Sequence, residues 1–188
     1  MAPIVESNPD DWWKVYEVNV KGPYLVARAT LPLLMESNDG LKQILTVSRY
    51  VRPSHCYTTK LTTRDSVGAH VVTPGVSAYQ SSKLAVLRVM DFVAAEYGSQ
   101  GITAITVHPG NIVNDIVGNP DDLGPELRAV FTETNELPAD TIVWLTSQKR
   151  KWLNGRYVNC TWDMPQLLEK EGSIVQGDRL RVKLDVDF

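Results

Sequence analysis

Residues 77–107 read SAYQSSKLAVLRVMDFVAAEYGSQGITAITV and predict a helix followed by a buried strand. Ser77 and Gln80 have the spacing of a capping box, in which each side chain bonds the other residue's amide at a helix start. Apolar residues then recur at helical spacing until Gly98, a residue type that favours a helix end. The apolar run 102–107 follows after a short link. This helix-to-strand unit is typical of an α/β layer fold.

The amino-terminal segment has the signals of a long helix with one interruption. Asn8 is a favourable N-cap, Pro9 suits the first helical position, and two aspartates follow in the first turn. Apolar residues recur at helical spacing over residues 9–36. Gly22-Pro23 is expected to kink or interrupt this helix, because proline offers no amide hydrogen.

Further strands and helices are expected before and after the opening stretch. The β-rich run 43–47 is typical of a buried strand, and 156–159 of a short one. Helical patterns cover residues 138–147 and 164–170, whereas the alternation in 180–186 is typical of a strand. The chain is therefore expected to form an α/β domain.

Composition and charge exclude several classes of protein. With 188 residues, 43% of them apolar, and a net charge of -3, the chain suits one globular domain that does not bind nucleic acid. Cys56 and Cys160 lie far apart, and neither they nor the three histidines have metal-ligand spacing, so no metal site is expected. No leader pattern is recognisable, and no run approaches the roughly 18 apolar residues of a membrane span. We therefore expect a cytoplasmic protein without membrane contact.

Three side chains in and before the opening stretch predict proton-transfer chemistry. Tyr79 and Lys83 are four residues apart and so share a helix face. An ammonium group within about 4 to 6 Å stabilises a phenolate and lowers the pKa of a phenol from its ordinary value near 10. Ser66, 13 residues before the tyrosine, could donate a hydrogen bond to the same substrate oxygen. Together they predict a site that acts on a carbonyl or an alcohol.

The ordered set of motifs resembles the short-chain dehydrogenase/reductase family. It comprises Asn19 within VNVKG, Ser66, YQSSK at 79–83, and HPGNI at 108–112 after the next strand. The resemblance covers nearly all of this chain but only the later part of the family fold. It implies a single truncated domain over residues 1–188, the carboxyl-terminal portion of a partial Rossmann-like, doubly wound parallel sheet. The implied activity is NAD(P)(H)-dependent interconversion of a small-molecule carbonyl and alcohol.

The resemblance also implies a role for each motif residue. Tyr79 would be the general acid-base, Lys83 would lower its pKa and hold the nicotinamide ribose, and Ser66 would orient the substrate oxygen. Asn19 would hold a water that links Lys83 to solvent for proton relay. The residues implied to contact NAD or NADP are Tyr79, Lys83, Pro109, Gly110, Ile112 and Asn114, the last standing where the family usually has threonine.

The sequence departs from the family pattern in two places. A complete member has a Gly-rich turn that binds the cofactor pyrophosphate at a helix N-terminus, and none of the 12 glycines forms one before Asn19. Residues 49–65 carry four basic side chains and no apolar period, which predicts a disordered insertion, such as a translated intron in a faulty gene model. Removing it joins the flanks as VSSVG, the usual family form. Because of the insertion, Ser48 is an alternative to Ser66 as the catalytic serine.

Two functions of different classes follow from these departures. The chain is either an oxidoreductase or a catalytically silent fragment that keeps the side chains but cannot hold cofactor. Family members commonly use the helices corresponding to residues 9–36 and 78–97 as a four-helix dimer interface, which implies a homodimer in either case. The missing strands would leave an edge of strand 43–47 open, so poor solubility is expected. The sequence decides neither the substrate nor the choice between NAD and NADP.

Overall fold

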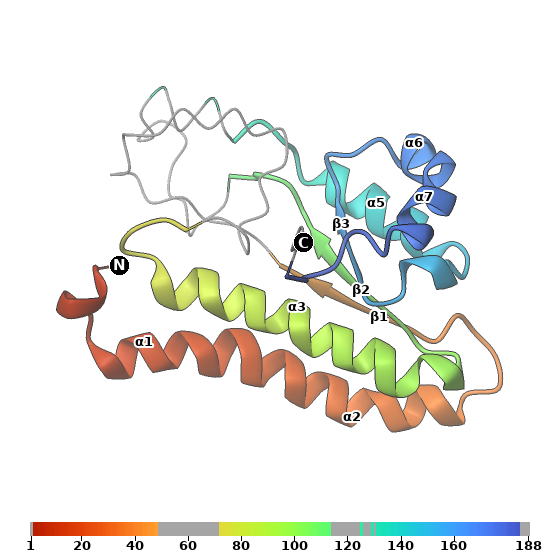
Figure 1. The fold of residues 1–188 in the computed structure, drawn as a ribbon, viewed down its shortest axis with the longest axis horizontal. Helices are drawn as coiled ribbons and strands as arrows, with labels where there is room; N and C mark the ends of the chain where they lie inside the picture. The colour runs from red at the N-terminus through yellow and green to blue at the C-terminus, as the bar shows by residue number, and fades with distance from the viewer. Residues whose placement is uncertain (1, 49–71, 114–124, 126–128, 130, 185–188) are drawn as a thin grey trace.

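A computed structural model of the chain describes residues 2–48, 72–113, 125, 129 and 131–184. Within these residues, parallel strands form a three-stranded sheet in the order β1-β2-β3 (Figure 1). Ile44 of β1 pairs with Ala104 of β2, and Ile105 of β2 pairs with Arg156 of β3. The strands lie within one residue of the positions predicted from sequence. Their bounds are Gln43–Val47 for β1, Thr103–His108 for β2 and Arg156–Asn159 for β3.

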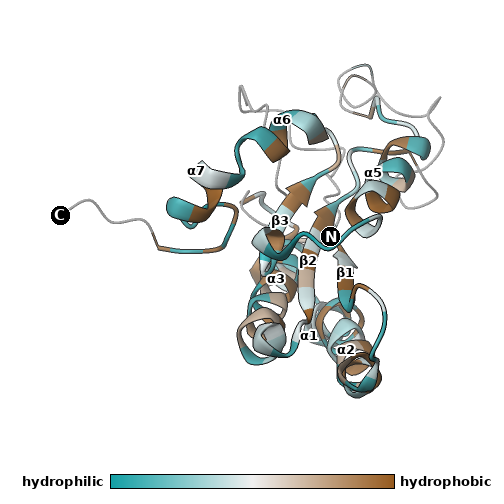
Figure 2. Ribbon diagram, turned by 90° about the vertical axis from the view of Figure 1, so that its right-hand side faces the viewer, coloured by the Kyte–Doolittle hydropathy of each residue, from teal (hydrophilic) through white to brown (hydrophobic). Residues whose placement is uncertain are grey.

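Helices cover both faces of the sheet. One layer contains α1, the π-helical turn η2, α2 and α3, and the other contains α5, α6 and α7 (Figure 2). The predicted helices near residues 138–147 and 164–170 are confirmed as α5 and α6. The first layer comprises α1 (Pro9–Tyr16), η2 (Glu17–Lys21), α2 (Gly22–Glu36) and α3 (Ser77–Tyr97). The second comprises α5 (Glu136–Thr146), α6 (Met164–Glu169) and α7 (Glu171–Gln176), and short 3-10 turns cover Ile4–Glu6, Gly98–Gln100 and Lys151–Leu153.

The first helix begins and is interrupted where the sequence predicts. The Asn8 side chain accepts hydrogen bonds from the amides of Asp10 and Asp11, so it caps α1. The interruption takes the form of the π turn η2, closed by a bond from the Gly22 amide to the Glu17 carbonyl. Pro23 can donate no bond to the carbonyl four residues before it, which favours the wider turn.

The cap at Asn8 gives a small, local prediction for stability. Asn8→Ala removes an acceptor from two amides in the first turn of α1, so we expect a loss of about 0.5 to 2 kcal/mol in the free energy of unfolding. Urea denaturation measures this loss. Asn38→Ala, in the turn after α2, is the matched control and should leave the midpoint close to that of the parent. Equal effects of the two substitutions would contradict the capping role.

The predicted capping box at the start of α3 is wrong. The helix begins at Ser77, Val76 occupies the N-cap position, and no side chain caps the turn. The buried Gln80 side chain instead bonds Thr73, accepting from its amide at 2.8 Å and donating to its hydroxyl at 3.2 Å. The Ser77 hydroxyl accepts from the Trp12 indole at 3.1 Å. Tertiary contacts have therefore taken both side chains away from the local motif.

The core lies on both faces of the sheet and is most complete around β2. All six residues of β2 are buried, whereas Gln43 to Thr46 of β1 are only half-buried and Val47 is exposed. Among the described residues, β1 pairs with a strand on one side only. The buried residues form two clusters. The first consists of Ile105, Val107, Leu145, Leu153, Val158, Cys160, Met164, Leu167 and Ile174. The second consists of Ala27, Leu31, Met90, Val93, Ala94, Ile102 and Ala104.

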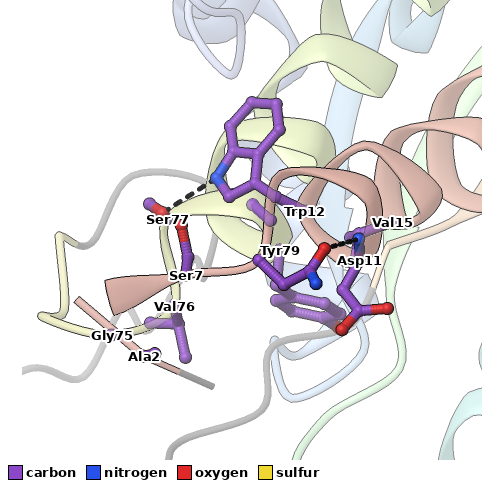
Figure 3. Close-up of a pocket in the computed structure, with 11 residues that line it drawn as sticks. Ala2, Ser7, Asp11, Trp12, Val15, Gly75, Val76, Ser77 and Tyr79 are labelled. Atoms are coloured by element: carbon purple, nitrogen blue, oxygen red, sulfur yellow. Dashed lines mark hydrogen bonds between the residues drawn. The ribbon is translucent and has the colours of Figure 1, made fainter. Parts of the chain in front are cut away.

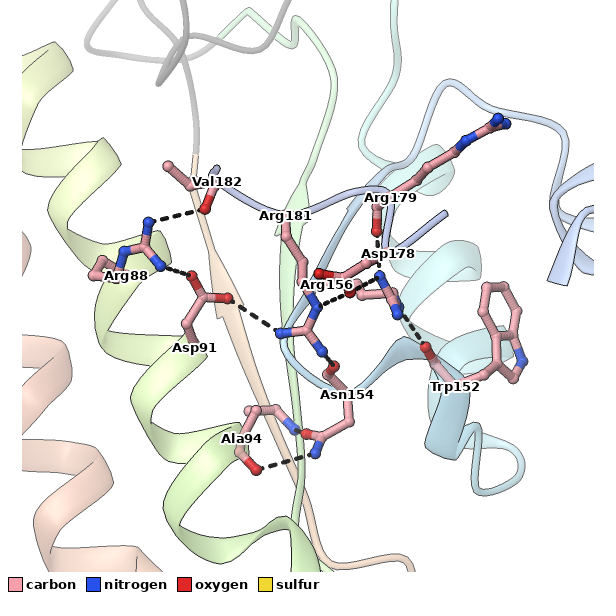
Figure 4. Close-up of polar contacts among 11 residues, drawn as sticks. Arg88, Asp91, Ala94, Trp152, Asn154, Arg156, Asp178, Arg179, Arg181 and Val182 are labelled. Carbon is pink, nitrogen blue, oxygen red and sulfur yellow. Dashed lines mark hydrogen bonds and ion pairs between the residues drawn. The ribbon is translucent and has the colours of Figure 1, made fainter. Parts of the chain in front are cut away.

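The carboxyl-terminal segment does not form the strand predicted at 180–186 over its described residues 180–184. It is attached to β3 and α3 through polar contacts of its backbone and side chains (Figure 4). The Tyr157 amide donates to the Leu180 carbonyl at 2.9 Å. Arg181 contacts Asp91 of α3 at 3.6 Å and Asp178 at 2.9 Å. These side-chain contacts replace the regular ladder that the alternating pattern suggested.

Candidate functional site

Tyr79 and Lys83 lie together in the first turns of α3. The Lys83 ammonium nitrogen is 5.3 Å from the centre of the Tyr79 ring, as the four-residue spacing predicts. Both side chains are half-buried, and burial lowers the pKa of Lys83 from its ordinary value because the charged form loses hydration. The pair can therefore support proton transfer at a bound oxygen atom.

Asn19 is linked by a hydrogen bond between helices to the turn of α3 that carries this pair. It lies in the π turn η2, and its side-chain amide donates to the Ser82 hydroxyl at 3.0 Å. The Ser82 hydroxyl in turn donates to the Tyr79 carbonyl at 2.7 Å. The structure therefore brings together Asn19, Tyr79 and Lys83, three of the four residues expected to be catalytic.

A cavity of about 270 Å³ lies beside Tyr79, between the starts of α1 and α3 (Figure 3). Trp12 forms part of its wall, and the indole is fixed by its bond to Ser77. The sequence spacing of Trp12 carries no signal for this contact with Ser77. The cavity is lined by Ala2, Ser7, Asn8, Asp11, Trp12, Val15, Gly75, Val76, Ser77, Ala78 and Tyr79, mostly through apolar atoms.

The segment after β2 turns sharply at the carboxyl edge of the sheet. Gly110 has a φ of 89°, and a Cβ there would lie 3.2 Å from the Glu133 side chain, so a larger residue would be both strained and crowded. The Asn111 amide donates to the Glu133 carboxylate at 2.9 Å, and Ile112 forms an isolated bridge with the same residue. Glu133 therefore fixes the HPGNI segment. No motif or spacing in the sequence indicated it.

Two predicted site residues and the insertion cannot be placed. Ser66, Asn114 and residues 49–65 lie outside the described residues, so their assignments stay predictions. The alternative serine, Ser48, is buried at the end of β1. Its amide donates to the Val107 carbonyl at 2.8 Å, and its carbonyl is 3.2 Å from the Nδ1 atom of His108. Both contacts are made by the Ser48 backbone, and they join the ends of β1 and β2.

The residues present fit one end of a nicotinamide dinucleotide. The ammonium of Lys83 and the phenol of Tyr79 are hydrogen-bond donors suited to ribose hydroxyls, and Pro109, Gly110 and Ile112 follow the adjacent strand at the carboxyl edge. Ligands of open α/β sheets bind outside this edge. The pyrophosphate end has no matching Gly-rich turn in the sequence before Asn19. The described residues therefore fit the nicotinamide ribose end of the cofactor.

Comparison with known proteins gives matches across most of the chain. Residues 41–160 match a family model described as Enoyl-(Acyl carrier protein) reductase. Short chain dehydrogenase pigC of Monascus ruber is 48% identical over 180 residues, which cover 96% of this chain and 53% of that protein. The chain belongs to the short-chain dehydrogenase/reductase family. A second relative, short chain dehydrogenase mpl6 of Monascus purpureus, is 41% identical over 97% of this chain and 55% of its own length. The chain thus spans about half the length of the curated relatives it matches.

Solved structures of similar fold confirm the predicted α/β class. A gluconate 5-dehydrogenase from Burkholderia cenocepacia, in complex with NADP and tartrate, aligns with a TM-score of 0.66 at 20% identity, over 84% of this chain and 57% of its own. A 3-oxoacyl-[acyl-carrier protein] reductase with bound NAD from Brucella melitensis aligns with a TM-score of 0.62 at 25% identity, over 84% and 53%. The parallel sheet is therefore part of a Rossmann-type short-chain dehydrogenase/reductase fold.

The described residues bear on the predictions about membrane contact and metal binding. They contain no helix that is both long and apolar enough to cross a membrane. They also contain no group of three or more histidine, cysteine, aspartate or glutamate residues arranged to hold a metal ion. The predictions about metals and membrane contact extend to the whole chain and stay predictions.

Proposed function

We propose that this short-chain dehydrogenase/reductase chain carries the catalytic half of an NAD(P)(H)-dependent oxidoreductase that interconverts a small-molecule carbonyl and an alcohol. The observation that supports this most directly is the placement of the Lys83 ammonium 5.3 Å from the Tyr79 ring centre. The family relationship and the NADP and NAD named with two neighbours support the choice of cofactor. The proposal includes turnover by this chain itself, which covers 53% of the length of the first relative.

The proposed roles follow from the chemistry of each side chain. The bound nicotinamide would supply or accept the hydride. Tyr79 would give a proton to the carbonyl oxygen during reduction and take it back during oxidation. Lys83 would stabilise the phenolate form of Tyr79, and Asn19 would hold water for proton exchange with solvent. Ser66 would orient the substrate oxygen, and Asn114 would contact the cofactor beyond Ile112.

A fluorescence titration with NADH and NADPH, followed by an assay of carbonyl reduction, tests the function. Saturable binding of either cofactor, with oxidation of that cofactor when a carbonyl is added, is the expected result. Binding that occurs with one cofactor only would also decide between NAD and NADP. Absence of both binding and turnover in folded protein would contradict the proposal for this chain.

The cavity beside Tyr79 is proposed to hold the non-reacting part of the substrate. Its lining is largely apolar and includes the Trp12 indole, so a flat apolar group fits its chemistry. Trp12→Ala should raise the KM for such a carbonyl about tenfold, equivalent to roughly 1.4 kcal/mol of lost contact. Steady-state kinetics measure this change.

Two further substitutions make the tryptophan experiment specific. Trp13→Ala is the matched control, because Trp13 is 58% exposed and does not line the cavity. Trp12→Phe keeps an aromatic wall but loses the bond to Ser77, so it separates packing from hydrogen bonding. A KM that rises equally in the Trp12→Ala and Trp13→Ala variants would contradict the assignment of the cavity.

A second candidate function is favoured by the partial coverage of the relatives, since this chain covers 53% of the length of the first of them. The chain would then be a silent fragment that keeps the side chains of the site but not a complete cofactor site. It could still pair with itself through α2 and α3, where Tyr24 and Phe92 are exposed beside an apolar groove of about 500 Å³. A dimer in analytical ultracentrifugation, without cofactor binding, would favour this candidate.

The location and domain organisation also belong to the proposal. We propose a single domain over residues 1–188, with residues 49–65 as an insertion into the family sequence. A cytoplasmic location suits a chain with only two cysteines. Sequencing of the mature transcript tests the insertion, since a message that lacks these codons would show that they are intronic.

A further inference from the structure

The Ser82 hydroxyl is fully buried and joins two parts of the candidate site. Ser82 is 0% exposed, accepts from the Asn19 side chain at 3.0 Å and donates to the Tyr79 carbonyl at 2.7 Å. A buried hydroxyl costs free energy unless it is hydrogen-bonded, and here it has both a donor and an acceptor as partners. One side chain therefore connects the π turn to the turn of α3 that carries the proton-transfer pair.

The π turn that carries Asn19 departs from regular α-helical hydrogen bonding. Pro23 cannot donate an amide hydrogen to the carbonyl of Asn19, so the regular α-helical bond at this point is missing. π turns inside α-helices frequently occur at functional sites. The Asn19 side chain bonds a residue outside its own helix, through the hydrogen bond that its amide donates to Ser82.

We propose that Ser82 is a positioning residue, whose hydroxyl holds Asn19 in place relative to Tyr79 and Lys83. This inference rests on the proposed function. Ser82 would not touch substrate or cofactor and would act through Asn19. The hydrogen bond from Asn19 to Ser82 would determine where Asn19 holds water beside Lys83. Loss of this bond should therefore slow proton exchange and leave the binding of substrate nearly unchanged.

Comparison of Ser82→Ala with Ser81→Ala tests the proposal. Ser81 is the matched control because its hydroxyl bonds only backbone carbonyls of its own helix, Ser77 and Ala78, among the contacts described. Ser82→Ala should lower kcat on the order of tenfold, keep the KM for the carbonyl and displace the pH–rate profile. Ser81→Ala should match the parent in all three. A Ser82→Ala variant with parent kcat and pH profile would overturn the proposal.

A double-mutant cycle with Asn19→Ala distinguishes positioning from a general loss of stability. If Ser82 acts through Asn19, the second substitution should change kcat little once the first is present. Effects on kcat that multiply fully would show that the two residues act independently and would overturn the proposal.

A measurement without turnover separates this inference from the proposed function. In ¹⁵N NMR spectra, the side-chain amide of Asn19 should have the same shift in the parent and in Ser81→Ala, but a changed shift and faster hydrogen exchange in Ser82→Ala. If the parent neither binds cofactor nor turns over, the proposed function fails while the hydrogen bond from Asn19 to Ser82 can still be observed. An Asn19 amide signal that does not respond to Ser82→Ala would overturn the inference whatever the activity.

Discussion

Tyr79→Phe should lower kcat by on the order of 10² to 10⁴ and weaken cofactor binding far less, because the ribose would lose only one hydrogen bond. The substitution removes a single oxygen from a ring that packs beside Lys83 in the first turns of α3. A general acid-base contributes about this range to the rate of proton transfer. Steady-state kinetics on the chain, or on a longer form that binds cofactor, measure the loss.

Tyr97→Phe is the control for the loss of a phenolic hydroxyl. Tyr97 is the last residue of the same helix, at the end away from Lys83. This variant should keep the parent rate. Parent activity in Tyr79→Phe would reject the assignment of Tyr79 as the acid-base, whatever the family relationship.

Lys83→Met should lower kcat on the order of 10² and raise the pH at which the rate of oxidation reaches half of its maximum. The reason is that the substitution removes the cation that favours the phenolate form of its neighbour. The pH dependence of kcat measures both changes. Lys14→Met is the control, since the Lys14 side chain is 72% exposed on α1. An unchanged pH–rate profile in Lys83→Met would contradict the proposed role.

The same substitution should stabilise the fold near neutral pH. Burial lowers the pKa of Lys83, because the charged amine loses hydration in the folded state. Below that lowered pKa the folded protein holds this charged amine, which reduces its free energy of unfolding. As the pH rises from the folded pKa toward the ordinary value of 10.5, the unfolded chain binds more protons, and the parent gains stability. The advantage of Lys83→Met in urea denaturation should therefore shrink over that window. A constant difference would show that burial of the charge is not its cause.

Local signals in the sequence were sufficient to predict much of the fold. The Asn8 cap, the break at Gly22-Pro23 and the three strands depend on capping chemistry, missing amides and short apolar runs, which act within a few residues. The contact between Tyr79 and Lys83 was predictable for the same reason, because helical geometry alone brings residues four apart together.

Features that depend on partners distant in sequence were not predictable. In the failed capping box, Ser77 is bonded by Trp12, 65 residues away, whereas Gln80 bonds Thr73, a nearer residue that lies outside the capping motif. The tail alternates as a strand does, yet Arg181 is held by Asp91 of α3. Ser82 lies inside the YQSSK motif, but nothing in the sequence indicates its bond to Asn19, and Glu133 belongs to no motif. Only the packing of helix on helix, and of loop on strand end, reveals what they contact.

The π turn η2 also sets the phase between the two halves of the amino-terminal helix. Each residue of an α-helix rotates the direction of its side chain by about 100°. The extra residue of a π turn lets α1 present Trp12, and η2 present Asn19, toward α3, while α2 presents Ala27 and Leu31 to the core beyond it. Deleting one residue between 17 and 21 would restore regular winding and turn the Trp12 side by a quarter of a circle or more. Insertions and deletions in this turn should therefore be far less tolerated than substitutions.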